Sequence, residues 1–125
     1  MRTSTLLTTT TTAATLLTLA AAKNTVVQVG EGGLKFTPDN ITGAKEGDTL
    51  EFHFYPKNHS VVSSTFDKPC VPNKDAIFSG FVPVESGEGE EVFTVTLNDT
   101  SKPVWVYCSQ GKHCQSGMVM AVNAP

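Results

Sequence analysis

The sequence lacks an excess of basic residues and has few charges of either sign. Lys and Arg number 9 against 12 Asp and Glu, for a net charge of -3, and charged residues make up only 17% of the chain. Without a basic face the protein has no electrostatic attraction for a phosphate backbone, so we expect no nucleic-acid partner. Serine and histidine adjoin only at His59-Ser60, without a further base, so we expect no nucleophilic enzyme.

A long hydrophobic run is also missing. Ala13–Ala22 is apolar but too short to span a bilayer, so no transmembrane segment is predicted. Arg2 is the one charge before it, Thr fills positions 8 to 12, and the run ends in three alanines, a pattern typical of a secretory signal peptide. We expect residues 1–22 to be this leader and residues 23–125 to form one secreted domain. An organelle transit peptide is the alternative, although such peptides are usually richer in arginine.

Helical periodicity is absent from the rest of the chain, where short β-rich runs alternate with Gly, Pro, Asn and Asp. This spacing predicts an all-β sandwich or barrel. In Thr49–Tyr55 the apolar residues alternate with polar ones, so His53 is expected on the solvated face and not at a metal. In Val104–Cys108 the thiol of Cys108 continues an apolar face, which places it at one end of the core. Residues 66–83 form a long irregular segment, which is uncommon unless it is functional or cross-linked.

Soft metal ligands are concentrated in one loop near the C-terminus. Cys108, His113 and Met118 follow one another at intervals of five residues. A thiolate, an imidazole and a weak thioether are ligand types of a blue-copper centre, which needs one more imidazole. His59, in the polar segment after Pro56, is the candidate for that ligand.

The cysteine count bears on the same site. Three cysteines in a secreted protein leave one thiol after one disulfide has formed, and an unpaired secreted thiol calls for a role. Copper ligation by Cys108 would supply that role. Pairing of Cys108 with Cys114 stays open, although it would consume the metal's thiolate and leave Cys70 alone.

These motifs resemble the single-domain blue-copper proteins, the cupredoxins. The chain contains Asn58-His59-Ser60-Val61 and, downstream, Cys-x4-His-Cys-x3-Met from Cys108 to Met118. The pattern is most similar to the phytocyanin branch and to the serine-rich secreted cupredoxin-like proteins of fungi. The resemblance implies a Greek-key β-sandwich or barrel of about seven to eight strands. It also implies one copper ion, cycling between Cu(I) and Cu(II), with four ligands: His59, Cys108, His113 and axial Met118.

The resemblance implies further roles for individual residues. A disulfide joins Cys70 to Cys114, and Asn58 ties the two ligand loops together by hydrogen bonds. Electrons leave through the ring edge of His113, and Tyr107, which precedes the thiolate, is a second candidate exit for which simple packing is the alternative. The implied function is one-electron transfer by a monomer, with a redox partner protein or a small-molecule donor or acceptor that the sequence does not identify.

Other interpretations stay open. A secreted copper-holding protein or a cell-wall module with the same fold and no shuttle role fits the same motifs. A zinc site of the three cysteines and His113 meets the ligand count but leaves His59 and Met118 unexplained. A laccase-like oxidase is excluded, because none of the three histidines forms a His-x-His pair. Fungal relatives often have a serine-rich tail and a lipid-anchor signal, neither of which occurs up to Pro125, so surface attachment also stays open.

Three N-glycosylation sequons occur in the chain. Those at Asn40 and Asn98 lie in exposed-looking turns, whereas a metal loop would hide the one at Asn58. The acidic run Gly87–Glu91 is expected to be a solvated hairpin turn.

Overall fold

The computed structural model describes residues 4, 5, 7–13 and 21–125. Residues 1–3, 6 and 14–20 belong to the predicted signal peptide, and that prediction therefore lies in good part outside the described residues. Within the described ranges all regular structure is β-strand, as predicted. The same ranges hold no helix that is long and apolar enough to cross a membrane.

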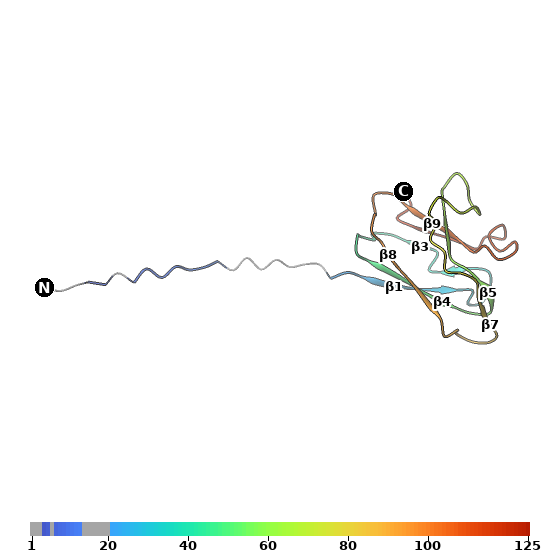
Figure 1. The fold of residues 1–125 in the computed structure, drawn as a ribbon, viewed down its shortest axis with the longest axis horizontal. Coiled ribbons are helices and arrows are strands. Elements are labelled where there is room, and N and C mark those ends of the chain that lie inside the picture. Colours follow the sequence, from blue (N-terminus) through green and yellow to red (C-terminus); the bar gives the residue numbers. More distant parts are fainter. Residues whose placement is uncertain (1–3, 6, 14–20) are drawn as a thin grey trace.

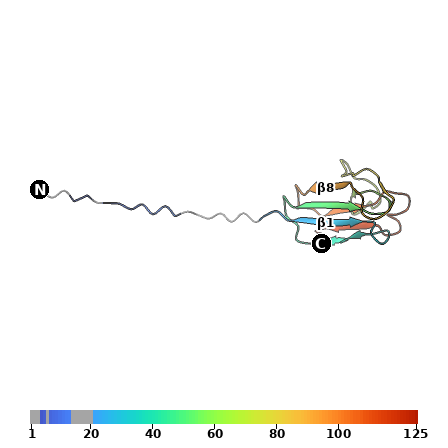
Figure 2. The same cartoon turned by 90° about the horizontal axis from the view of Figure 1, so that it is seen from below.

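The strands form two four-stranded sheets and one small two-stranded sheet (Figures 1 and 2). The first sheet has the order β2-β1-β4-β8 and consists of β1 (Asn24–Val29), β2 (Phe36–Thr37), β4 (Thr49–Phe54) and β8 (Val92–Thr96). The second has the order β3-β10-β9-β6 and consists of β3 (Asn40–Ile41), β6 (Val62–Ser64), β9 (Val104–Tyr107) and β10 (Val119–Val122). The third pairs β5 (Lys57–His59) with β7 (Val82–Val84). The described residues form ten strands, whereas about seven to eight were expected. Two of the ten, β2 and β3, are only two residues long.

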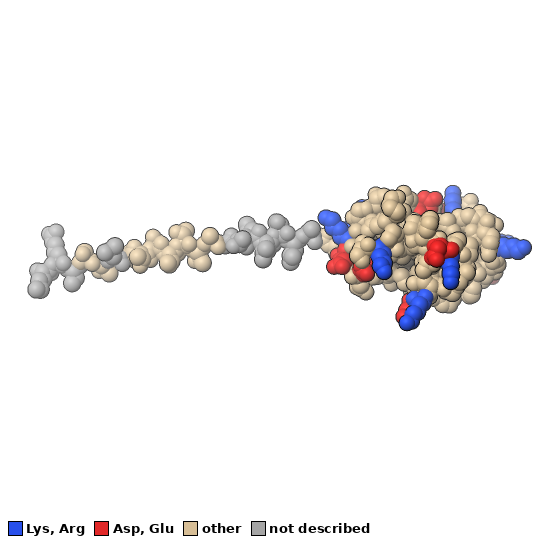
Figure 3. Space-filling model, turned by 90° about the horizontal axis from the view of Figure 1, so that it is seen from above, with Lys and Arg blue, Asp and Glu red and all other residues tan. Residues whose placement is uncertain are grey.

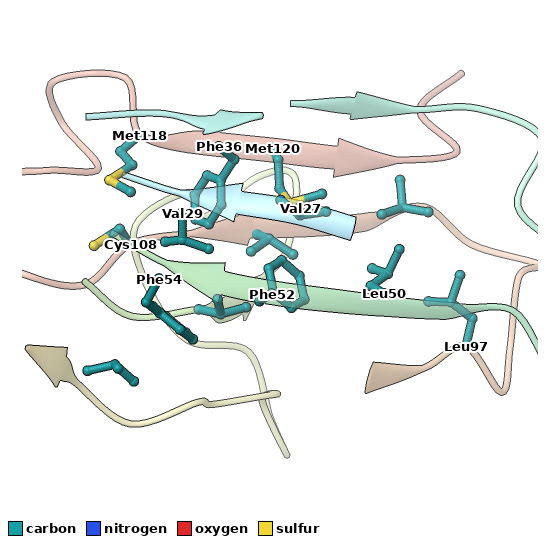
Figure 4. Packing of buried hydrophobic residues seen from close by; sticks show 14 residues of the cluster. Val27, Val29, Phe36, Leu50, Phe52, Phe54, Leu97, Cys108, Met118 and Met120 are labelled. Atoms are coloured by element: carbon teal, nitrogen blue, oxygen red, sulfur yellow. The ribbon is translucent and has the colours of Figure 1, made fainter. Parts of the chain in front are cut away.

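The core lies between the two larger sheets. Leu50, Phe52 and Phe54 of β4 point inward, as the alternation of their strand predicts. They pack against Val106 and Met120 of the second sheet (Figure 4). Each such side chain, once buried, stabilises the fold by roughly 1.5–3 kcal/mol.

Strand direction brings the ends of several strands together at one end of this core. Strands β1 and β4 run parallel, with Val29 opposite Phe54, so the residues that follow both strands lie at the same edge. Strands β9 and β10 run antiparallel, with Tyr107 opposite Val119, so Cys108 and Met118 lie side by side just beyond them. This end of the sandwich therefore receives three segments that are far apart in the sequence: the residues after β1, the residues after β4, and the loop between β9 and β10.

The predicted irregular segment is present between β6 and β7. In the described residues this segment contains two isolated β-bridges. One pairs Val62 with Phe78, and the other pairs Thr65 with Lys68. The hydroxyl of Ser63 accepts a hydrogen bond from the Ile77 amide and donates one to Asn73, which ties the segment back to β6.

Charged side chains are scattered over the surface. Figure 3 shows one face on which Lys side chains alternate with Asp and Glu and do not gather into a basic patch.

Candidate metal centre

Three side chains of the predicted ligand set meet at the end of the core. His59 ends β5, Cys108 follows β9, and His113 lies in the β9–β10 loop; their ligand atoms all lie within 4.8 Å of one another. The sulfur of Cys108 is 3.9 Å from Nδ1 of His59 and 3.4 Å from Nδ1 of His113. Metal–nitrogen and metal–sulfur bonds are about 2.0–2.3 Å long, so one ion can contact the sulfur and both imidazole nitrogens at these separations. The geometry therefore suits a single transition-metal ion.

Met118, the fourth predicted ligand, lies beside them. Its side chain is fully buried, and Figure 4 shows its sulfur and that of Cys108 at the same end of the core. The Met118 amide donates to the His113 carbonyl at 3.0 Å, and the Cys108 amide donates to the Met118 carbonyl at 3.2 Å. These backbone bonds close the loop, so that its thiol, imidazole and thioether belong to one compact turn.

The ring of His59 has a fixed orientation. Its Nε2 lies 3.0 Å from the carbonyl oxygen of Pro56, and because a carbonyl can only accept, Nε2 must hold the proton. The lone pair is then on Nδ1, the nitrogen that faces Cys108. His59 is only 2% exposed and ends a short strand paired with β7, in the polar segment after Pro56.

Gly30 makes room for that ring. It follows β1 with a φ of +84°, and a Cβ at this position would lie 2.2 Å from Nε2 of His59. Any side chain here would therefore displace the imidazole, besides imposing the strain of a left-handed backbone.

The sulfur of Cys108 is enclosed and meets a backbone donor. It has no solvent exposure, and the amide of Ser60 points at it from 3.4 Å. The hydroxyl of Ser60 contacts the Ser109 hydroxyl at 2.7 Å and accepts a bond from the Ser109 amide at 2.9 Å. Ser60 follows the candidate ligand His59, and Ser109 follows the candidate ligand Cys108, so these two serines link the two segments. The amide N–H of Ser60 thus helps to hold the sulfur in position beside the two imidazoles.

Asn58 links the same two segments from the other side. Its Nδ2 donates to Oε1 of Gln110 at 3.0 Å, across 52 residues of sequence. Its Oδ1 is buried and, within the described residues, has no hydrogen-bond partner. The amide therefore spans from β5 to the loop that contains His113.

The disulfide predicted between Cys70 and Cys114 is confirmed. It closes a 44-residue separation and leaves Cys108 as the free, buried cysteine among the described residues. Pairing of Cys108 with Cys114 is therefore wrong, and so is the zinc site, which needed all three cysteines as ligands. The disulfide packs with Val62 and Tyr107 and fixes the irregular segment against the residue that follows His113.

The third histidine lies elsewhere, as predicted. His53 is on the outer face of the first sheet, where Nε2 lies 2.7 Å from Glu51 and Nδ1 lies 2.5 Å from Glu88 in the acidic turn. The hydrogen bond to Glu51, followed by the bond to Glu88, raises the pKa of His53. The pKa of Glu51 is lowered, first by the bond to His53 and then by the bond from Asn24. His53 thus belongs to a charged surface cluster and not to the candidate metal centre.

The two candidate electron exits differ in their surroundings. His113 is half-buried, which leaves the residue partly accessible from the surface. Tyr107 is buried under the disulfide, and this burial raises the pKa of its hydroxyl.

Four residues that help to build the site were not found from the sequence: Gly30, Ser60, Ser109 and Gln110. The one local signal is that Ser60 and Ser109 each directly follow a candidate ligand. Gly30 has no such signal, because it is 29 residues from His59 and reaches it only through the parallel pairing of β1 with β4.

Two fungal proteins are similar to this chain in sequence, whereas no family model matches it. Both come from Arthroderma benhamiae. An extracellular serine-rich protein is 49% identical over 109 residues, which cover 86% of this chain and 41% of that protein. A probable GPI-anchored cupredoxin is 43% identical over 108 residues, which cover 86% of this chain and 54% of that protein. The chain thus spans about half the length of these relatives.

Solved structures show the same fold at low sequence identity. Reduced auracyanin from Roseiflexus castenholzii superposes with a TM-score of 0.55 at 17% identity, covering 85% of this chain and all (100%) of auracyanin. An azurin from Methylomonas sp. strain J gives a TM-score of 0.60 at 15% identity, covering 82% of this chain and 98% of that protein.

Fold, ligand cluster and relatives together define the class. A two-sheet sandwich with a buried thiol and two imidazoles at one end is the architecture of a small mononuclear copper protein. The chain belongs to the blue-copper cupredoxin family.

Proposed function

We propose that the chain is a secreted type 1 copper protein that transfers single electrons. His59, Cys108 and His113 would be the equatorial ligands and Met118 the weak axial one. The observation that supports this most directly is the approach of two imidazole nitrogens to one buried sulfur at 3.9 and 3.4 Å. Bound copper would supply the redox couple, and the donor set matches the ligands of blue-copper sites.

The protein's own contribution would be to hold the ligands still. His59 is fixed through Pro56, Cys108 through Ser60, and the His113 loop through the Cys70–Cys114 disulfide. Ligands that are already in place need little rearrangement when the charge at the centre changes. Half-buried His113 would be the route for electrons to the surface, and buried Tyr107 is the less accessible second candidate.

Titration of the purified metal-free protein with Cu(II) tests this proposal. We expect an intense blue absorption band from the copper–thiolate bond at a stoichiometry of one copper per chain. Reversible voltammetry with rapid electron self-exchange would support the shuttle. Copper that is tightly held but exchanges electrons slowly would indicate a copper-holding protein instead, and a protein that stays colourless would contradict the type 1 site.

An extracellular location completes the proposal. The names of the two fungal relatives describe an extracellular protein and a GPI-anchored one. The proposed leader over residues 1–22 and the disulfide both agree with an oxidising compartment. Mass spectrometry of the secreted protein should find Lys23 at its N-terminus. The redox partner would be a protein or a small molecule that reaches the His113 edge.

A further inference from the structure

The outer face of the second sheet holds an apolar groove of about 450 Å³. Its lining includes Phe66, Trp105, Val119 and Ala121. The rings of Phe66 and Trp105 form a tilted pair with centroids 5.1 Å apart. Phe66 is 74% exposed and Val119 42%, so this aromatic surface is open along much of its length.

Strand register places an exposed asparagine at the edge of the groove. Asn40 of β3 pairs with Ala121 of β10, which pairs with Trp105 of β9, which in turn pairs with Ser64 of β6. Residues directly opposite one another point to the same face of a sheet, so these four side chains form one row across the outer face. Asn40 lies two strands from Trp105, which corresponds to about 10 Å.

Asn40 also begins the sequon Asn40-Ile41-Thr42, and both Asn40 and Thr42 are exposed. The other two sequons differ from it. Asn58 is half-buried and hydrogen-bonded to Gln110, while Asn98 is exposed in the β8–β9 connection. Of the three sequons, the one at Asn40 begins at a residue that lines the groove.

We propose that Asn40 bears an N-linked glycan whose first sugar rings lie across Ala121 and pack on Trp105 and Phe66. The proposal rests on the extracellular location proposed above and does not depend on copper. Nδ2 of Asn40 would form a bond to C1 of the first N-acetylglucosamine, while the bond from C1 to the diphosphate of a lipid-linked oligosaccharide donor breaks. The amide proton leaves and the lipid diphosphate is the leaving group.

The chemistry of the groove suits a sugar. The apolar C–H face of a pyranose ring packs on aromatic rings, and Trp and Phe provide large rigid surfaces for it. Asp39, Ser64 and Thr65 line the same groove and present oxygen atoms to sugar hydroxyls. The first two rings of a glycan are long enough to reach from Asn40 to Trp105.

Such a glycan would cover two exposed features at once. Large exposed apolar patches favour association, and so do unpaired sheet edges. β3 is one of the two edge strands of the second sheet, so a glycan on Asn40 would lie both at that edge and over the apolar groove.

The single tryptophan of the chain permits a direct test, because all tryptophan fluorescence reports on Trp105. The full chain is secreted from a fungal host, and glycopeptide mass spectrometry measures occupancy at Asn40 and Asn98. Enzymatic removal of N-glycans should shift Trp105 emission to longer wavelength and increase its quenching by acrylamide. Asn98→Gln should respond to the enzyme as the natural sequence does, whereas Asn40→Gln should already emit at long wavelength and not respond.

Two further variants keep the result interpretable. The enzyme converts the glycosylated asparagine to aspartate, so Asn40→Asp reproduces the product and should match deglycosylated protein. Thr42→Val removes the sequon and retains the asparagine. An unmodified Asn40, or Trp105 emission that does not change when an Asn40 glycan is removed, would overturn the proposal. So would a dimer in which Trp105 is equally shielded with and without the glycan, since a second copy would then cover the groove.

The copper titration separates this proposal from the proposed function. A blue protein with an unmodified Asn40 contradicts the glycan alone. A colourless protein with a glycan on Asn40 contradicts the copper site alone.

Discussion

His53 and His59 are six residues apart in the sequence, yet their surroundings differ in every respect that matters for chemistry. His59 is buried, hydrogen-bonded through Nε2 to a carbonyl, and faces a thiol with Nδ1. His53 is on the surface, and carboxylates contact both of its nitrogens. The first environment leaves a lone pair free for a metal, whereas the second stabilises the charged imidazolium, which has no lone pair to offer.

The sharpest test of this difference exchanges the two histidines for residues that cannot ligate. His59→Ala should abolish the blue band, because the equatorial set then lacks one imidazole. His53→Ala should leave the band and the copper stoichiometry unchanged. Visible spectra of the two copper-loaded variants measure the difference. Loss of the band in the His53 variant would mean that the surface cluster at Glu51 affects the copper site.

A second test concerns the disulfide, which braces the loop of His113 and has no counterpart near His53. Replacing Cys70 and Cys114 together by alanine should lower the free energy of unfolding by about 2–4 kcal/mol, since a crosslink over this separation restricts the unfolded chain. Urea denaturation of the metal-free protein measures the change. An unaltered unfolding free energy would show that the irregular segment is held by its hydrogen bonds alone.

A third test asks whether space at the His59 ring is as important as the ring itself. Gly30→Ala should weaken copper binding by roughly 10–100-fold, as expected when the support of a ligand is disturbed, and should cost at least the ~1–2 kcal/mol of a left-handed residue with a side chain.

Gly43 offers the matched control for this test. It has a φ of +70°, and a Cβ added there would have no neighbour within 4 Å, so Gly43→Ala imposes backbone strain without touching a ligand. Copper titration and urea denaturation of both variants separate the two contributions. Equal copper affinity in the two variants would contradict the role assigned to Gly30.

The smallest expected effect is the pH dependence of the His53 cluster. The pKa of His53 is raised in the folded protein, so its stabilising contribution is complete below its ordinary value of 6.5 and is lost as pH rises through the raised pKa. The pKa of Glu51 is lowered, so its contribution is complete above 4.5 and is lost as pH falls.

Both contributions are therefore present between these two values. His53→Gln should lower the melting temperature most between pH 4.5 and 6.5 and least in alkaline solution, by a few degrees at most because the pairs are exposed. Calorimetry across this range measures the effect. A difference that grows with pH would contradict the assignment of charge to His53.

The fold was largely predictable because its signals are local. Alternation in β4 and β9 identified which side chains face the core, and the clustering of Cys108, His113 and Met118 in one loop brought three candidate ligands together within a single turn. The short strand β3 was not predicted, because a two-residue strand exists only through its partner.

Parts of the site were beyond local patterns. The contact of Gly30 with His59 depends on the parallel pairing of β1 and β4, and the contact of Ser60 with Cys108 crosses 48 residues. No periodicity or spacing encodes either contact, because a turn glycine or a serine after a histidine is common in many folds.

Residue type and order alone determined that this chain forms β-strands around an apolar core and that it possesses a thiol, two imidazoles and a thioether suited to copper. Tertiary structure decided which imidazole nitrogen faces the thiol, which cysteine stays free, and which sequon asparagine lines an aromatic groove. The physical reason is that chemical identity belongs to single residues, whereas burial, hydrogen-bond partners and open space are properties of segments that meet only when the sheets have paired.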